Sequence, residues 1–287
     1  MKLFQGHRSA IGIAVVLAVA LSCLTWAAFS DDPARIGEVV QSYLKLVEQR
    51  SAKPLDFPKI KELYAALSPL FLEAEAILPG LRQEADGYLA RAEKAPVKLP
   101  LLQGVEKSAQ RAFVALMERS LNKVKTQSNN TAAALASLKA AKALYGGIEN
   151  TALRRGDYVG SQRLFQDRVL FAFTYLEDAV KAKNTKNIDA GIAEILGVVD
   201  KVYFLSVLYE IDGIGANRGK NEDVVAEKVI EGTVFFKIIK ASAKNAQAVA
   251  AFEAELAKPP AEMNLQALKE YLKIAYPDLA AEFKAKM

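Results

Sequence analysis

Residues 209–223 read YEIDGIGANRGKNED and separate two long segments, 188–211 and 224–239, in which apolar residues recur at helical spacing. Glycines and amides crowd into the centre of this stretch, and two adjacent acids close it. A helix end, a turn and a helix start explain every residue type used here. The stretch therefore predicts two consecutive helices joined by a short turn.

Each residue type in the turn has its own physical role. Glycine permits the left-handed backbone that ends a helix, asparagine suits turns and caps, and acids complement the dipole of a helix start. The expected helix-ending residues are Gly213 and Gly215, the turn residues are Asn217 and Gly219, and the capping group is Asn221 with Glu222 and Asp223.

The same stretch also resembles an ion-binding or phosphate-binding loop, but two loop mechanisms fail on spacing. A calcium loop starting at Asp212 needs oxygen ligands where Ile214 and Ala216 stand. The glycines do not match the G-x-G-x-x-G spacing of a dinucleotide loop. The remaining hypothesis is that four acids converge on a cation or a cationic ligand. These candidate metal ligands are Glu210, Asp212, Glu222 and Asp223.

Helical spacing continues on both sides of this stretch, and alternating strand patterns do not occur. The prediction is an all-α, irregular bundle of about ten helices. Asp32-Pro33 and Asp56 to Pro58 have the form of N-caps followed by proline in the first turn. Asp157 is expected to cap a helix over RLFQDRVLFAFTYLEDAV, residues 163–180, which is apolar on nearly all sides and should lie centrally.

The first thirty residues have the pattern of an export signal. A short basic start precedes an uncharged apolar run, and small residues flank Phe29 just before Asp31. Residues 9–29 are also long enough to span a bilayer as an uncleaved anchor. The expected organisation is a signal or anchor over residues 1–30, an N-terminal helical region over 31–126 and a C-terminal bundle over 127–287, with one continuous domain from residue 31 as the alternative. The predicted location is periplasmic or otherwise extracytoplasmic, with membrane contact only through residues 9–29 if they are not removed.

The residue inventory excludes several chemistries. The single cysteine, histidine and tryptophan are Cys23, His7 and Trp26, all within the leader. Disulfides, thiolate nucleophiles, Cys/His zinc sites and imidazole-based triads therefore have no residues in the remainder. No run of lysines and arginines marks a nucleic-acid surface, although the formal charge is +5. Carboxylates, tyrosines, lysines and hydroxyls are what is left, and carboxylate or tyrosine oxygens suit hard cations.

Four tyrosines that lie near the candidate acids in the sequence could ligate ferric iron, although aromatic residues at helical spacing are also typical of a core. They are Tyr158, Tyr175, Tyr203 and Tyr209. The neighbouring acids Glu177 and Asp178 point about 100 degrees apart on a helix, so a solvated face suits them better than a shared proton or metal.

The segment from Arg155 to Val180 contains Gly156-Asp157-Tyr158 followed by FAFTYLEDAV. It resembles the periplasmic helical region that accompanies bacterial high-affinity iron permeases. The Arg-Glu-Gly-x-Glu motif and the membrane helices of the permease itself do not occur here. The resemblance implies an exported helical module that handles iron.

Together these patterns predict an exported, non-enzymatic helical protein without a cofactor, which binds or scaffolds an unknown protein or small ligand and no nucleic acid. The alternative is a periplasmic protein that handles iron or another hard cation through carboxylate and tyrosine oxygens. A third hypothesis is a carboxylate-based hydrolase, which needs two acids facing each other in a cleft, one with a raised pKa.

Overall fold

The computed structural model describes residues 28–287, which form thirteen α-helices and four short 3-10 helices and no strand. The predicted all-α bundle is therefore confirmed. The N-terminal helices are η1 (Phe29–Asp31), α2 (Pro33–Gln49), α3 (Phe57–Ala66), α4 (Ser68–Ala74), α5 (Leu81–Lys94), α6 (Leu99–Thr126), α7 (Thr131–Tyr145) and α8 (Glu149–Tyr158). The C-terminal helices are α9 (Leu164–Lys181), α10 (Thr185–Asn217), α11 (Glu222–Ile239), η2 (Lys240–Ser242), α12 (Ala246–Leu256), η3 (Pro260–Glu262), α13 (Leu265–Ala275), α14 (Pro277–Glu282) and η4 (Lys284–Lys286).

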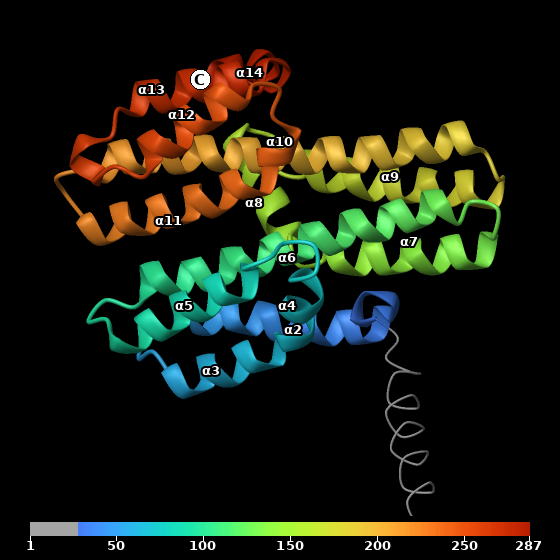
Figure 1. The fold of residues 1–287 in the computed structure, drawn as a ribbon, viewed down its shortest axis with the longest axis horizontal. Coiled ribbons are helices and arrows are strands. Elements are labelled where there is room, and N and C mark those ends of the chain that lie inside the picture. Colours follow the sequence, from blue (N-terminus) through green and yellow to red (C-terminus); the bar gives the residue numbers. More distant parts are fainter. Residues whose placement is uncertain (1–27) are drawn as a thin grey trace, which may run out of the picture.

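Two long helices, α6 and α10, organise the bundle. Helix α6 packs against α4, α5, α7 and α11, and α10 packs against α8, α9, α11 and α13. In Figure 1 the N-terminal helices α2–α5 lie along one side of the molecule and α12–α14 along the opposite side. The interior between α6, α10 and α11 is therefore the place where both halves of the chain meet.

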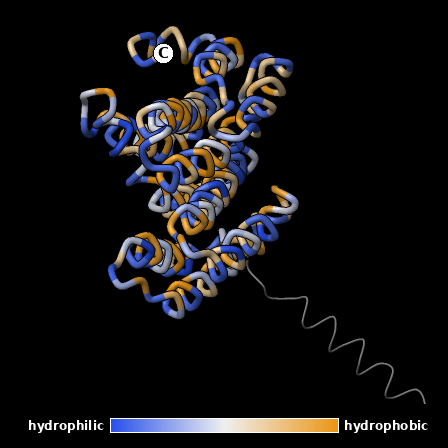
Figure 2. The backbone as a smooth tube through the Cα atoms, turned by 90° about the vertical axis from the view of Figure 1, so that its left-hand side faces the viewer, coloured by the Kyte–Doolittle hydropathy of each residue, from blue (hydrophilic) through white to orange (hydrophobic). Residues whose placement is uncertain are grey.

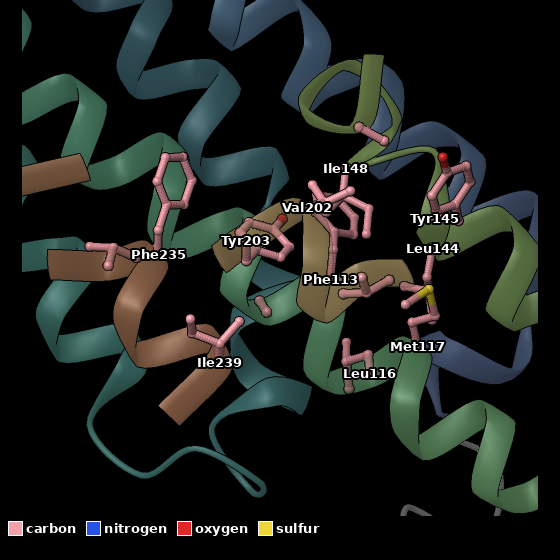
Figure 3. Packing of buried hydrophobic residues seen from close by; sticks show 14 of the residues in the cluster. Phe113, Leu116, Met117, Leu144, Tyr145, Ile148, Val202, Tyr203, Phe235 and Ile239 are labelled. Carbon is pink, nitrogen blue, oxygen red and sulfur yellow. The ribbon is translucent and has the colours of Figure 1, made fainter. Parts of the chain in front are cut away.

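The core between these helices is continuous and aromatic. Phe113 of α6, Tyr203 of α10 and Phe235 of α11 are buried there beside residues of α7 (Figure 3). The same cluster of buried apolar residues extends from Phe29 to Ala280, so it includes both predicted regions. The division at residues 126/127 stays a prediction.

Polar caps and amphipathic faces explain where most helices begin. Hydrophobic and hydrophilic residues alternate around individual helices, as Figure 2 shows. The side chain of Asp32 accepts from the amides of Ala34 and Arg35, and Asp56 accepts from that of Lys59. Both predicted proline-bearing caps are thus confirmed. Asparagine caps α7, α10, α11, α12 and α13 in the same way.

The predicted helix end at Ile211 is wrong, because α10 continues through Gly213 and Gly215 to Asn217. The backbone turns at Gly219, where φ is +74°. Asn221 then caps α11 by accepting from the amide of Val224 at 3.2 Å, as predicted. The two internal glycines are used for close packing between helices instead of termination.

The central position predicted for residues 163–180 is also wrong. Helix α9 leaves Phe171 72% exposed, and α10 takes the interior place. Asp157 does not cap α9, because it lies in the last turn of the short helix α8.

The predicted signal or anchor lies almost wholly outside the described residues. Its last residues do have a structure: Phe29 is buried, and the Ser30 amide donates to Glu73 at 2.8 Å. None of the helices within residues 28–287 is both long and apolar enough to cross a bilayer. Export and location stay predictions.

Gly156 provides a test of how tightly α8 is held. A Cβ added there would lie 2.4 Å from the backbone oxygen of Gln162 and 2.6 Å from that of Ser161. Backbone atoms cannot move aside cheaply, so Gly156→Ala should lower the free energy of unfolding by about 1–3 kcal/mol.

Gly87→Ala is the matched control, because a Cβ at this helical position meets nothing within 4 Å. It should stabilise the protein by about 0.5–1 kcal/mol. Urea denaturation followed by circular dichroism measures both, and equal stability of the two variants would contradict the packing at Gly156.

Candidate functional site

The four acids proposed as metal ligands face different neighbours. Glu210 is 2% exposed and points into the interior, whereas the Asp212 side chain is 43% exposed and pairs with Lys269. Glu222 accepts from the amide of Gly219 at 2.8 Å, and Asp223 is exposed in the first turn of α11. Within residues 28–287 no three acidic, histidine or cysteine side chains gather in a way that could hold a metal ion.

Gly213 is placed to let Lys228 reach Glu210. A Cβ at Gly213 would lie 2.9 Å from Cδ of Lys228, so the bare glycine lets the lysine stem cross α10 closely. The Lys228 ammonium then lies 2.9 Å from Glu210 Oε2 and 3.0 Å from Glu231 Oε2. The glycine that looked like part of a loop site is therefore part of a helix contact that positions a buried ion pair.

This ion pair belongs to a chain of alternating charges in the protein interior. In order, its members are Arg50, Glu106, Lys107, Glu231, Lys228 and Glu210. Lys107 contacts Glu106 and lies 3.2 Å from Glu231, which links α6 to α11. We call this series of ion pairs the charge chain. Because breaking a buried ion pair leaves an uncompensated charge, the charge chain fixes α6, α10 and α11 relative to one another and joins the C-terminus of α2 to them.

The two carboxyls beside Lys228 titrate in opposite directions. Burial, together with the neighbouring Glu231, raises the pKa of Glu210 to about 8. Burial acts on Glu231 as well, but Lys107 and Lys228 overcome it and lower the pKa of Glu231 to about 2. Glu231 is thus the firmer anion of the two, and Glu210 takes up a proton at a much higher pH than an ordinary carboxyl.

Arg155 of α8 is the buried base without a carboxylate. It is 7% exposed, and its Nε and Nη1 are buried with no hydrogen-bond acceptor in residues 28–287. Its guanidinium carbon lies 4.1 Å from the centroid of the Tyr209 ring. Burial lowers the pKa of Arg155, and the nearby Glu210 opposes this shift. By contrast, the other buried bases of the described chain, Arg50 and Lys107, both contact Glu106.

A cavity of about 440 Å³ opens beside this guanidinium, between α6, α8, α10 and α11. Arg154 and Asp157 line it and are exposed, so they mark its mouth. Its charged and polar lining residues are Gln103, Lys107, Thr151, Arg154, Arg155, Asp157, Glu210, Glu227, Lys228 and Glu231, and its aromatic ones are Tyr158, Tyr209 and Phe235. The cavity combines fixed charges with aromatic walls, which suits an organic ligand that carries charge.

Two of the four candidate tyrosines, Tyr158 and Tyr209, belong to this cavity. Their rings meet edge to face at 5.4 Å, and the Tyr158 hydroxyl donates to Asp212 at 2.8 Å. Tyr203 is buried and donates to Gln110 in the core. Tyr175 is partly exposed on α9.

Sequence reasoning did not find Arg155, Lys228, Glu231 or Lys107. Charged residues on amphipathic helices usually face water, and no residue type in 101–126, 149–158 or 224–239 distinguishes these four from their exposed neighbours. The one sequence feature that could have indicated the contact with Lys228 was Gly213. A glycine inside a helical pattern can mark a position where another segment packs closely, as well as a helix end.

Comparisons with known proteins do not assign this chain to a class. No family model matches it, and no curated protein or solved structure is significantly similar to it. The function is therefore argued from the cavity alone.

Glu210 gives a pH-dependence that can be measured. A folded-state pKa near 8, against an ordinary value of 4.5, means that the folded protein holds a proton that the unfolded chain releases. This contribution to stability is fully present below pH 4.5 and is lost as the pH rises toward 8. Replacing Glu210 with Gln removes the titration but keeps the shape of the neutral acid.

We expect the stability of Glu210→Gln, relative to the unchanged protein, to increase by a few kcal/mol between pH 5 and pH 8, since one pKa unit corresponds to about 1.4 kcal/mol. Urea denaturation at each pH measures this difference. A constant difference across the range would show that Glu210 titrates as an ordinary carboxyl.

Proposed function

We propose that the protein is an exported, non-enzymatic binding protein that holds a small ligand in the cavity between α6, α8, α10 and α11. The observation that carries this proposal is the buried guanidinium of Arg155, which has no ion-pair partner within residues 28–287 and lies at the wall of a cavity. An isolated buried charge is costly unless something compensates it. A ligand in the cavity supplies that compensation.

The size and lining of the cavity support a ligand of metabolite size. Its volume of about 440 Å³ is within the roughly 300–1,000 Å³ range of small-molecule sites. Three of the four walls, α6, α10 and α11, are joined by the charge chain and by the aromatic core. A preformed site of this kind loses little conformational entropy when a ligand binds, so ordering of the site weakens the affinity only slightly.

Iron handling is the second candidate, and one contact favours it. The Tyr158 phenol and the Asp212 carboxylate are already joined, and both are oxygen ligands suited to ferric iron. Lys269 lies 2.9 Å from Asp212 Oδ1, however, and supplies a positive charge at that position. Ferric iron would have to displace this ammonium.

The carboxylate hydrolase is supported less well by the same cavity. Glu210 and Glu231 are an acid with a raised pKa and an anion, which is the pairing that such an enzyme needs. Both carboxylates bind the same Lys228 ammonium. A substrate could reach both acids only by displacing Lys228 from its two ion pairs.

Blocking the mouth of the cavity tests the binding function. The full-length protein is screened by thermal denaturation against acetate, benzoate, L-glutamate, inorganic phosphate, putrescine, glucose, ferric citrate and calcium. A ligand at 100 times its Kd should stabilise the fold by about 2.7 kcal/mol, which raises Tm by several degrees. Asp157→Trp, which narrows the mouth, should weaken binding at least about 10-fold, or about 1.4 kcal/mol.

Asn150→Trp is the matched control, because Asn150 is exposed on the same helix and does not line the cavity. It should leave the affinity unchanged. Equal loss in both variants, or no stabilisation by any compound, would refute the binding function. Stabilisation by ferric citrate with a tyrosinate-to-iron absorbance band that Tyr158→Phe abolishes would instead favour the iron alternative.

A further inference from the structure

We propose that the cavity selects a small organic acid and that Arg155 is the residue that anchors its carboxylate. This inference rests on the proposed binding function and adds the chemical class of the ligand. It follows from the charges around the cavity, the position of the guanidinium and the character of the walls.

Among the basic residues that line the cavity, Arg155 is the buried one without an ion-pair partner in residues 28–287. Lys107 and Lys228 line the cavity, but each already contacts two carboxylates of the charge chain. Arg154 is exposed at the mouth, where water screens it. None of the ion pairs within 4.0 Å in the described chain involves Arg155. The positive charge that an anion would neutralise most effectively is therefore that of Arg155.

Aromatic rings surround the guanidinium, and no ion pair within residues 28–287 engages it. Its central carbon lies 4.1 Å from the centroid of the Tyr209 ring and 6.0 Å from that of Tyr158. Its Nε and Nη1 are buried without an acceptor among the described residues, and the N–H groups of a guanidinium form a planar fork. A planar fork of this kind matches the two oxygens of a carboxylate.

The acids of the lining favour a single negative charge on the ligand. Asp157 and Glu227 also face the cavity, and both would repel a dianion such as phosphate more strongly than a monoanion. Glu227 accepts from the Gln103 amide at 2.8 Å and so keeps a fixed place on the wall. A monocarboxylate carries one negative charge, which balances the one positive charge of Arg155.

The aromatic residues favour an organic body on that acid. Tyr158, Tyr209 and Phe235 supply ring surface to the cavity. Such surface binds apolar groups, whereas a bare inorganic anion would leave it in contact with water. Together with the charge balance, this points to a carboxylate attached to an apolar or aromatic group.

Matched probes test the charge requirement directly. Benzoate and benzamide have nearly the same shape, but only benzoate is an anion at pH 7. Isothermal titration of the full-length protein should show saturable binding of benzoate and at least about 10-fold weaker binding of benzamide and of inorganic phosphate, since benzamide lacks the charge that strengthens a hydrogen bond and phosphate lacks the apolar group.

Two arginine variants locate the anchor. Arg155→Gln should weaken benzoate binding about 10- to 100-fold. Arg163→Gln removes the same charge from an exposed position that does not line the cavity and should change the affinity less than about 3-fold, because screened surface charges contribute little. Arg155→Lys, which keeps the charge but not the fork, should fall between the unchanged protein and Arg155→Gln.

Circular dichroism and Tm of the unliganded variants show whether each one folds, and a folded Arg155→Gln protein that binds benzoate normally would overturn the proposal. Equal binding of benzoate and benzamide would overturn it too. If a neutral or cationic compound binds in a manner sensitive to Asp157→Trp while carboxylates do not, the binding function stands and the assignment of a carboxylate ligand is wrong. If no compound binds, the binding function itself is wrong.

Discussion

The half-buried ammonium of Lys228, held between the buried carboxylates of Glu210 and Glu231, is the interaction on which the interior of this protein depends. It exists because Gly213 has no side chain and so lets the lysine stem cross α10. Lys107 extends the same contact to α6. Such charges are stable in an interior only when each has its partners, so the spacing of α6, α10 and α11 is set within narrow limits.

The cavity shares four residues with the charge chain. Lys107, Lys228, Glu210 and Glu231 take part in the ion pairs and also line the cavity. Arg155 reaches the same region from α8, where Glu210 opposes the lowering of its pKa by burial. Glu210 is paired with Lys228, and Arg155 is part of the lining of a cavity of about 440 Å³, the size of a small-molecule site.

Much of the architecture could be predicted from the sequence, because caps and breaks are local. Asp32, Asp56 and Asn221 cap helices as expected, since a capping side chain bonds to amides two or three residues ahead of it. The candidate site depends on tertiary contacts and was therefore harder to predict from the sequence. Glu210 was predicted as one of four candidate metal ligands, but its partner Lys228 lies on the next helix, and nothing in the local pattern shows which face of that helix is buried.

Glycine was the source of the main error. Gly213 and Gly215 were assigned to a helix end because glycine favours one, whereas in α10 they permit close contact with Lys228 and Leu265. A glycine in the sequence does not reveal whether the backbone turns at that position or another side chain packs closely against it. Only the packing of distant segments distinguishes the two uses.

The central claim is that Arg155 presents an unmatched charge to a ligand in a preformed cavity. A crystal structure of the full-length protein purified from its native host, without added ligand, tests this claim most directly. The account predicts electron density for a small molecule in the cavity, with a carboxylate within hydrogen-bond distance of the Arg155 guanidinium. A cavity closed by side chains, with Arg155 paired to Glu210 or another carboxylate of the protein itself, would contradict it.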